Sequence, residues 1–173
     1  MSRRYLPTNR KESAVTRFYR FMFNIFPCYR GSGGRVVFIS SNWHEIQVRL
    51  KLSWRTRNYV GSVFGGSIYG SIDPIYMFQL LKILGKEYIV WDKAATIKFI
   101  RPIKTTVYAK FEINNELINE IKLEVSKHGK YIVDLPVEYI DKDKLVYAIS
   151  SKHLYIASKD YYKARNKMRA NES

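Results

Sequence analysis

The segment from Gly65 to Leu84 constrains the fold more than any other, because its residues leave almost no polar face. As a helix it would be apolar on nearly every side, through Ile68, Tyr69, Ile72, Ile75, Met77, Leu80, Leu81 and Leu84. A helix that is apolar all round has to be buried all round. We therefore expect a sheet to wrap this segment, or a second subunit to cover what the first leaves bare.

Asp73 interrupts this segment and is followed at once by Pro74. A carboxylate among apolar residues is costly unless it is capped, paired or used. Local signals favour Asp73 as the N-cap of a helix that starts at Pro74. In the alternative, the helix starts near Gly65, Asp73 lies two turns inside it, and Pro74 kinks it. The amides of Gly65 and Gly66 would then form a site for an oxyanion or a phosphate.

Hydrophobic periodicity predicts strands before and after this segment. Apolar residues alternate with polar ones, or form short apolar runs between turn residues, over 35–40, 45–52, 88–100, 106–114, 120–127 and 130–140. Strands joined by short turns form antiparallel sheets. Together with the apolar helix they predict an α+β architecture with one sheet of five to six strands.

Both ends of the chain are predicted to be helical. Residues 9–26 form a basic amphipathic pattern whose apolar stripe consists of Val15, Phe18, Met22, Ile25 and Phe26. We expect this stripe to pack against its own domain; weak contact with a membrane surface is the alternative. The tail over 151–168 is predicted to be a basic, largely exposed helix.

A chain of 173 residues is most simply a single domain. We expect a helical extension over 1–30, a core over 31–150 and a basic helix over 151–173. Cys28 is the one cysteine, and no Cys/His spacing predicts a metal site. No segment is typical of a membrane span or a signal peptide, so we expect a cytoplasmic protein.

The net charge of +15 is uneven, since residues 1–72 contain twelve Lys and Arg against two acids. Such a bias indicates an anionic partner, which could be a nucleic acid, an anionic membrane surface or a phosphate-bearing small molecule. A solvated basic surface without a partner is the alternative. The positive charges are spread along the chain without a nucleic-acid motif, so no nucleic acid is expected.

Specific motifs connect the chain to a known family. The stretch NYVGSVFGG (58–66), followed seven residues later by Asp73, is similar to the motif N-x-x-G-x-x-H-G-G…D of the phenylacetyl-CoA branch of the hotdog-fold thioesterases. Over residues 28–140 the pattern is more similar to an uncharacterised bacterial hotdog family, a domain of unknown function. The resemblance implies a long central helix, starting near Gly65 and wrapped by an antiparallel sheet, with extra helices at both ends.

The resemblance also implies site residues. In such acyl-CoA thioesterases the helix aspartate acts as nucleophile or general base, a role that falls on Asp73. The amide at the helix start polarises the thioester carbonyl, which falls on Gly66, and Asn58 helps to hold the site. The chain departs from the motif at Phe64, where the thioesterases carry histidine. Phenylalanine offers no hydrogen bond to substrate or water.

The resemblance further implies a substrate that runs along the helix at the interface of a homodimer, or of a tetramer. The substrate would be acyl-CoA or an acyl-carrier protein thioester, with coenzyme A as part of the substrate and no other cofactor. The residues expected to line the acyl path are Gly65, Phe64, Tyr69 and Met77, and those expected at the phosphates of coenzyme A are Arg57, Lys98 and Arg101. These three cations could equally be solvated charges.

Two further interpretations stay open. A non-catalytic acyl-binding protein would use Phe64 to line its slot instead of supporting hydrolysis. Separately, Asp92 could form a structural ion pair with Lys93 or with Arg101.

Overall fold

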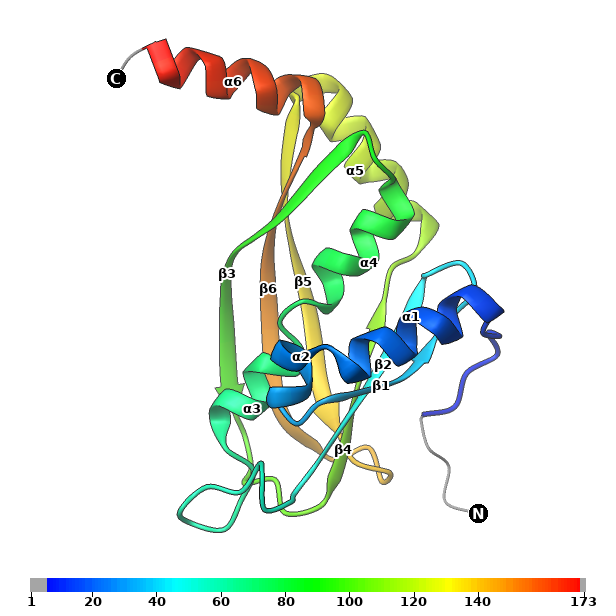
Figure 1. Cartoon of the computed structure of the whole chain (residues 1–173), viewed down its shortest axis with the longest axis vertical. Helices are drawn as coiled ribbons and strands as arrows, with labels where there is room; N and C mark the ends of the chain where they lie inside the picture. Colours follow the sequence, from blue (N-terminus) through cyan, green and yellow to red (C-terminus); the bar gives the residue numbers. More distant parts are fainter. Residues whose placement is uncertain (1–5, 172–173) are drawn as a thin grey trace.

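A computed structural model describes residues 6–171 as an α+β fold with one six-stranded sheet (Figure 1). The elements follow in the order α1 (Ala14–Ile25), α2 (Pro27–Gly31), β1 (Arg35–Ile39), β2 (Glu45–Lys51), α3 (Gly65–Gly70), α4 (Ile75–Leu84), β3 (Tyr88–Phe99), β4 (Thr106–Glu112), α5 (Asn115–His128), β5 (Lys130–Ile140), β6 (Val146–Ser158) and α6 (Lys159–Asn171). The strand order is β1-β2-β4-β5-β6-β3, and every neighbouring pair is antiparallel.

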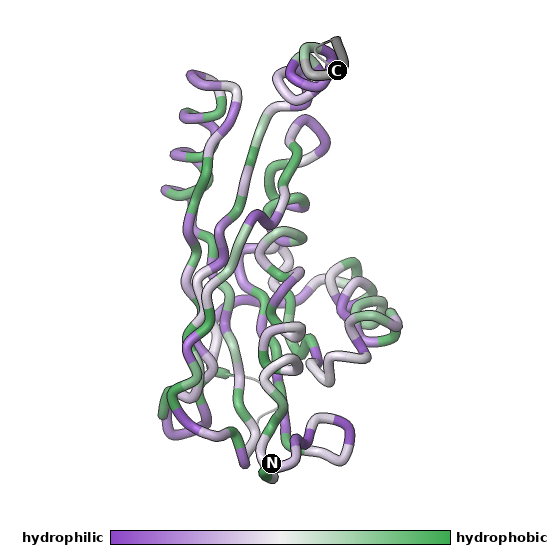
Figure 2. Tube along the Cα trace, turned by 90° about the vertical axis from the view of Figure 1, so that its left-hand side faces the viewer, coloured by the Kyte–Doolittle hydropathy of each residue, from purple (hydrophilic) through white to green (hydrophobic). Residues whose placement is uncertain are grey.

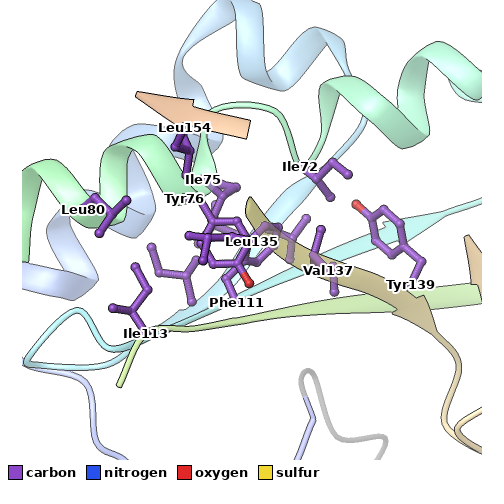
Figure 3. Close-up of a cluster of buried hydrophobic side chains, with 14 of the residues drawn as sticks. Ile72, Ile75, Tyr76, Leu80, Phe111, Ile113, Leu135, Val137, Tyr139 and Leu154 are labelled. Carbon is purple, nitrogen blue, oxygen red and sulfur yellow. The ribbon is translucent and has the colours of Figure 1, made fainter. Parts of the chain in front are cut away.

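The sheet curves around the helical stretch formed by α3 and α4, as expected. Viewed from the side, the strands form one layer, with α1 and the α3–α4 stretch set off from it (Figure 2). Ile72, Ile75 and Leu80 of this stretch point toward Phe111 and Val137 of the sheet (Figure 3), and all five are almost inaccessible to solvent. This contact forms the core of the domain.

A helix begins at Ile75, one residue after the locally predicted start at Pro74. The prediction that Asp73 caps it and that the glycines before it form a loop was wrong, because Gly65–Gly70 already form the helix α3. The chain leaves α3 after Gly70, makes a tight turn and enters α4 at Ile75. The amide of Asp73 still donates to the carbonyl of Tyr69, at 3.0 Å. Pro74 holds the N-cap position of α4, and no side chain caps it. Asp73 therefore lies inside a kinked helical stretch and does not cap its beginning.

The predicted strand over 120–127 was wrong, because these residues belong to α5. Ile118, Ile121 and Val125 form its buried face, at the spacings of three and four that a helix requires. Asn114 accepts a hydrogen bond from the amide of Leu117 as the N-cap. Gly129 ends the helix in the left-handed conformation, which glycine adopts without steric cost. The capping residues Asn114 and Gly129 thus indicate a helix more reliably than the short alternating pattern over 120–127 indicates a strand.

The predicted helix over 151–168 was wrong in its first half. Residues 146–158 form β6, which pairs with β5 on one side and β3 on the other, and the helix starts only at Lys159. Ala148, Ser150, Lys152, Leu154 and Ile156 alternate inward and are all buried. The two errors offset one another, so the sheet still contains six strands.

Helix α1 is predicted correctly, but the direction of its apolar stripe was wrong. Each residue of the stripe is at least 40% exposed. The helix packs instead through Tyr19 and Phe23, whose rings lie 5.2 Å from the ring of Trp43 and 4.7 Å from that of Phe78. Sequence periodicity detected an apolar face, but the tertiary contacts use the other side of the helix.

The two edges of the sheet differ. At the β1 edge, the side chain of Asn24 accepts from the amide of Val36 at 3.0 Å and donates to its carbonyl at 2.8 Å. Glu12 accepts from the amide of Ile39 at 3.1 Å. The segment around α1 thus satisfies the outward backbone groups of β1. On the opposite edge β3 pairs only with β6 among the described residues, and an uncovered edge strand is a template for pairing with another chain.

Candidate active site

The start of α3 meets the end of β3 at the candidate site. The ring of Phe99 lies 3.2 Å from the position that a Cβ on Gly65 would occupy. The ring of Phe64 lies within 2.3 Å of the corresponding position on Gly66. Both phenylalanines are more than half exposed. Each of the two glycines that begin the helix, whose amides lack partners within a helix, therefore lies against an accessible aromatic ring.

Asp73 carries a partly exposed carboxylate, and this carboxylate is paired. One of its carboxylate oxygens lies 2.6 Å from the Nζ atom of Lys152, and this side chain of β6 is completely buried. Asp92 of β3 lies 3.2 Å from the same ammonium. The side chain of Asp73 remains 44% exposed, so water or a ligand can reach it. Of the three ways in which the Asp73 carboxylate could be stabilised (capping, pairing or use in a reaction), the structure shows an ion pair with Lys152.

The expected pairing of Asp92 with Lys93 or Arg101 was wrong, because its partner is Lys152. Burial opposes the charge on Lys152, but the hydrogen bond with Asp73 and the charges of both carboxylates raise the pKa of the Lys152 ammonium above its usual value. Burial also raises the pKa of Asp92, against the opposing effect of Lys152. Lys152 is therefore a charged group at neutral pH, held in a polar pocket beneath the central helix.

Tyr69 completes this cluster from one turn before Asp73. Its hydroxyl lies 3.4 Å from the Nζ atom of Lys152, which also lies 5.1 Å from the centre of the ring. Desolvation and a hydrogen bond with Asp73 raise the pKa of Tyr69, so it stays a neutral phenol. Tyr69 and Met77 are both half-buried on the face that Asp73 occupies. They are among the residues of the helical stretch that the chain's own sheet leaves partly uncovered.

Asn58 stabilises the loop that leads into the helix. Its side chain accepts from the amide of Ser62 at 2.9 Å and donates to the Ser62 hydroxyl at 3.0 Å. Gly61 completes this turn with a φ of 81°, where a side chain would be strained. An open depression of about 710 Å³ lies against this loop, lined in part by Trp54, Arg57 and Asn58, and it does not include Asp73.

The three expected phosphate-binding cations lie at this end of the molecule and are exposed. Lys98 and Arg101 flank Phe99 in sequence, and Phe99 is the residue that contacts Gly65. Arg57 is joined to the start of the helix through a β-bridge to Val63. Arg101 donates to the carbonyl of Val146, which uses part of its guanidinium. The structure thus brings the three expected cations near the start of the helix.

The sequence interpretation missed Lys152. The available signal was the alternation of small and apolar residues over 148–156, in which residue 152 takes an inward position. A strand assignment there would have placed a lysine inside the sheet, where it needs a carboxylate partner. Because the segment was assigned to a helix, that reasoning was not possible.

Residues 6–171 contain neither a metal-binding cluster nor a membrane-spanning helix. Over residues 6–171, no three His, Cys, Asp or Glu side chains gather where they could hold a metal ion. Within the same range, none of the helices has the length and apolar character needed to cross a membrane.

A kinked central helix wrapped by a sheet of order β1-β2-β4-β5-β6-β3 defines a hotdog-like α+β protein. The particular family follows from the sequence, since the domain of unknown function DUF4442 matches residues 15–156. The chain belongs to this family. None of the curated proteins matches it in sequence.

Solved structures give the same fold. A protein of unknown function from Pseudomonas aeruginosa, PA5026, described as a probable thioesterase, superposes with a TM-score of 0.72 at 19% identity, over 85% of this chain and 98% of that one. The thioesterase HI1161 of Haemophilus influenzae gives 0.61 at 11% identity, over 87% and 96%. The PaaI protein from the phenylacetic acid degradation operon of E. coli gives 0.57 at 15%, over 81% and 91%. The fold of this chain is thus that of proteins described as thioesterases.

Proposed function

We propose that this protein hydrolyses an acyl thioester at a site formed between two copies of the chain. The observation that carries the proposal is the placement of Asp73. It is an accessible carboxylate on the central helix, fixed by a buried lysine, on the helix whose first amides include that of Gly66. The similarity of fold to proteins described as thioesterases supports the same class of reaction.

In the proposed reaction, Asp73 accepts a proton from a water molecule as the water oxygen attacks the carbonyl carbon of the thioester. The negative charge moves to the carbonyl oxygen, and the amide of Gly66 donates a hydrogen bond to it. A donor of this kind contributes about 3–4 kcal/mol to the transition state. When the tetrahedral intermediate collapses, the carbon–sulfur bond breaks, and the sulfur leaves as a thiol after taking from Asp73 the proton that the water gave up, which restores the carboxylate.

The proposal assigns Lys152 a positioning role. Its ammonium lies below the helix and binds Asp73 from the protein interior, so the exposed part of the carboxylate is directed outward. The lysine itself is buried and does not reach the surface that a substrate would occupy. It acts on the reaction through Asp73.

The free edge of β3 supports a dimer. Strand β3 has twelve residues and carries two side chains that are more than half exposed, Trp91 in its first half and Phe99 at its last position. Pairing of two β3 edges would extend the sheet across both copies and cover apolar surface at the same time. Such a dimer would also bring a second chain to the face of Tyr69, Asp73 and Met77.

The coenzyme A portion of a substrate would lie near Lys98 and Arg101, and the acyl chain near Tyr69 and Met77. Acyl-CoA is the first substrate to test, because exposed cations lie beside the helix start. An acyl-carrier protein thioester presents the same pantetheine arm, and it is tested in parallel.

The test is the release of free thiol from a panel of medium-chain and aromatic acyl-CoA thioesters. We expect Asp73→Asn to abolish release. Asp134→Asn is the matched control, because Asp134 is an exposed carboxylate of β5 that pairs with His153. Full activity of Asp73→Asn would disprove the role of Asp73.

A second function, binding of acyl thioesters without turnover, is favoured by one observation. Phe64 and Phe99 give the helix start an apolar lining in place of a hydrogen-bonding side chain. This function predicts saturable binding of acyl-CoA with no thiol released. Phe64→His separates the two, since the position is exposed and the substitution introduces the histidine of the thioesterase motif. A hydrolase with a weakened site would gain turnover from the histidine, whereas a binding protein would stay inactive.

A further inference from the structure

Helix α1 presents a continuous apolar surface to solvent. This surface, the α1 stripe, is formed by Val15, Phe18, Phe21, Met22, Ile25 and Phe26, which are between 40 and 59% exposed. Within the helix the stripe follows spacings of three and four, so its members lie side by side on one face. Single exposed apolar residues are ordinary, but an aligned group of this size marks an interaction surface.

The stripe is held rigidly. On the opposite side of α1, the hydroxyl of Tyr19 accepts from the Nζ atom of Lys82 at 2.8 Å. The ring of Phe23 lies 5.4 Å from the ring of Tyr29, and the hydroxyl of Tyr29 donates to the carbonyl of Ser71 at 3.0 Å. Ser13 caps the start of the helix with a reciprocal pair of hydrogen bonds to Thr16. The exposed face is therefore already formed before anything binds, and binding needs little ordering of the chain.

The charges around the stripe have one sign. No Asp or Glu occurs between residues 13 and 44. Glu12, just before the helix, forms an ion pair with Arg20, whose Nε atom lies 2.8 Å from the Oε1 atom of Glu12. Lys11, Arg17 and Arg30 are exposed at the start, along the flank and beyond the end of α1. An apolar face that carries phenylalanines and is bordered by cations matches the chemistry of an anionic lipid surface.

A second copy of the chain fits this surface poorly. In a symmetric contact the same patch meets itself, so Arg17 and Arg30 of both copies would be brought together. The chain supplies no acidic residue between 13 and 44 to balance them. Like charges placed together across an interface oppose association. Anionic headgroups would neutralise the same cations.

We propose that α1 is a membrane-docking helix, which lies in the surface of an anionic bilayer with the α1 stripe turned toward the acyl chains. Lys11, Arg17 and Arg30 contact the headgroups. In Figure 1, α1 lies beside α2 and in front of the strands, at the side of the molecule away from β3. Docking by α1 thus leaves the β3 edge available for a partner chain.

Vesicle binding tests the proposal directly. Cys28 is the one cysteine of the chain, is exposed, and lies two residues beyond Phe26, so an environment-sensitive fluorophore attached there reports on burial of the stripe. We expect a blue shift with vesicles that contain phosphatidylglycerol and a much smaller one with pure phosphatidylcholine. Sedimentation of the unlabelled protein with the same vesicles measures the partition coefficient and confirms that the label does not cause binding.

Two variants and a control isolate the causes. Phe18→Glu with Phe21→Glu is expected to weaken partition at least about tenfold, because it removes apolar area and adds negative charge. Arg17→Gln with Arg30→Gln is expected to weaken binding to anionic vesicles and to leave binding to neutral ones unchanged. Leu123→Glu is the matched control, since Leu123 is 52% exposed on α5. Circular dichroism checks that each variant is folded.

Three results would overturn the proposal. The first is absence of binding of the unmodified protein to anionic vesicles. The second is equal binding by the Phe18/Phe21 variant. The third is dissociation of a larger oligomer by that variant, measured by native mass spectrometry, without any vesicle binding by the unmodified protein; the stripe would then be an interface between copies.

Discussion

Helices α1 and α4 are both rich in apolar residues, and the fold treats them in opposite ways. In α4 the side chains of Ile75 and Leu80 have no exposed surface. In α1 the most apolar face points to solvent, and the helix is attached through Tyr19, Phe23 and a few hydrogen bonds. An amphipathic pattern thus shows that a face will be covered, but it does not show whether the chain itself covers it.

The difference follows from position in the sheet. The α3–α4 stretch lies in the concavity of six strands, which bury most of its apolar side chains, while Asp73, Met77 and Leu81 stay partly exposed. Helix α1 lies beside the short edge strand β1 and satisfies its backbone groups through Asn24. One side of α1 is enough for that task. Its other side is left for a different partner.

The largest expected effect is on the stability of α4. Leu80→Ala removes a completely buried side chain and leaves a cavity, which should lower the free energy of unfolding by about 2–5 kcal/mol. Chemical denaturation measures it. Leu81→Ala is the matched control, because Leu81 is its neighbour and is 36% exposed. Equal losses in the two variants would mean that the helix is not oriented as described.

The second largest effect is expected at the ion pairs that Lys152 forms with Asp73 and Asp92. Lys152→Met keeps the length of the side chain but leaves Asp73 and Asp92 without their common partner. Removing one member of a buried ion pair exposes the desolvation cost of the other, so we expect a loss of about 2–3 kcal/mol. Asp134→Asn, at an exposed pair, should change stability by less than about 1 kcal/mol. A neutral or stabilising Lys152→Met would show that the pair is not needed for stability.

The pH dependence of the free energy of unfolding provides a second test of the Lys152 ion pairs. The pKa of Lys152 is raised in the folded state, so the folded protein holds this proton more tightly than the unfolded chain. The stabilisation is fully present below the ordinary lysine value of 10.5 and is lost as the pH rises through the raised value. The stability difference between the unmodified protein and Lys152→Met should therefore shrink above that pH. A difference that stays constant through this range would contradict the assigned pairing.

The smallest effect is expected on the outer face of α1. Phe18→Ala should change the free energy of unfolding by less than about 0.5 kcal/mol, because the side chain is exposed in the monomer. Phe23→Ala, on the inner face of the same helix, should cost about 1–3 kcal/mol, since its ring packs against Tyr29 and Phe78. Thermal unfolding in the absence of lipid compares the two. A large effect of Phe18→Ala would place the stripe inside the fold.

Much of the fold could be predicted from the sequence, but the prediction failed where two kinds of local signal compete. The strands at 35–40, 45–52, 88–100, 106–114 and 130–140 all correspond to observed strands. The segment over 120–127 alternates for a few residues, yet Asn114 and Gly129 cap a helix there. The segment over 151–158 has strong strand residues that precede a basic helix, and the two were merged. In both cases the residues within the segment were considered without the signals that mark where a helix begins or ends.

The candidate site was predictable only in part. Asp73 and Gly66 were found from the motif, and the helix start at Gly65 agrees with it. Lys152 was not found, because it lies 79 residues from Asp73 in the chain and only the pairing of β6 into the sheet brings it beneath the helix. The roles of Asp73, Asn58 and Gly66 in a reaction stay predictions.

The amino-acid pattern alone predicts that the stretch from Gly65 to Leu84 is buried, since a helix without a polar face is not stable in water. It also determined, through alternation and turn residues, that an antiparallel sheet would bury it. Two features depend on long-range contacts that no local pattern predicts. Lys152 binds Asp73, and α1 turns its apolar stripe toward solvent. Local patterns record which surfaces avoid water, whereas the identity of what covers them depends on contacts between residues far apart in the chain.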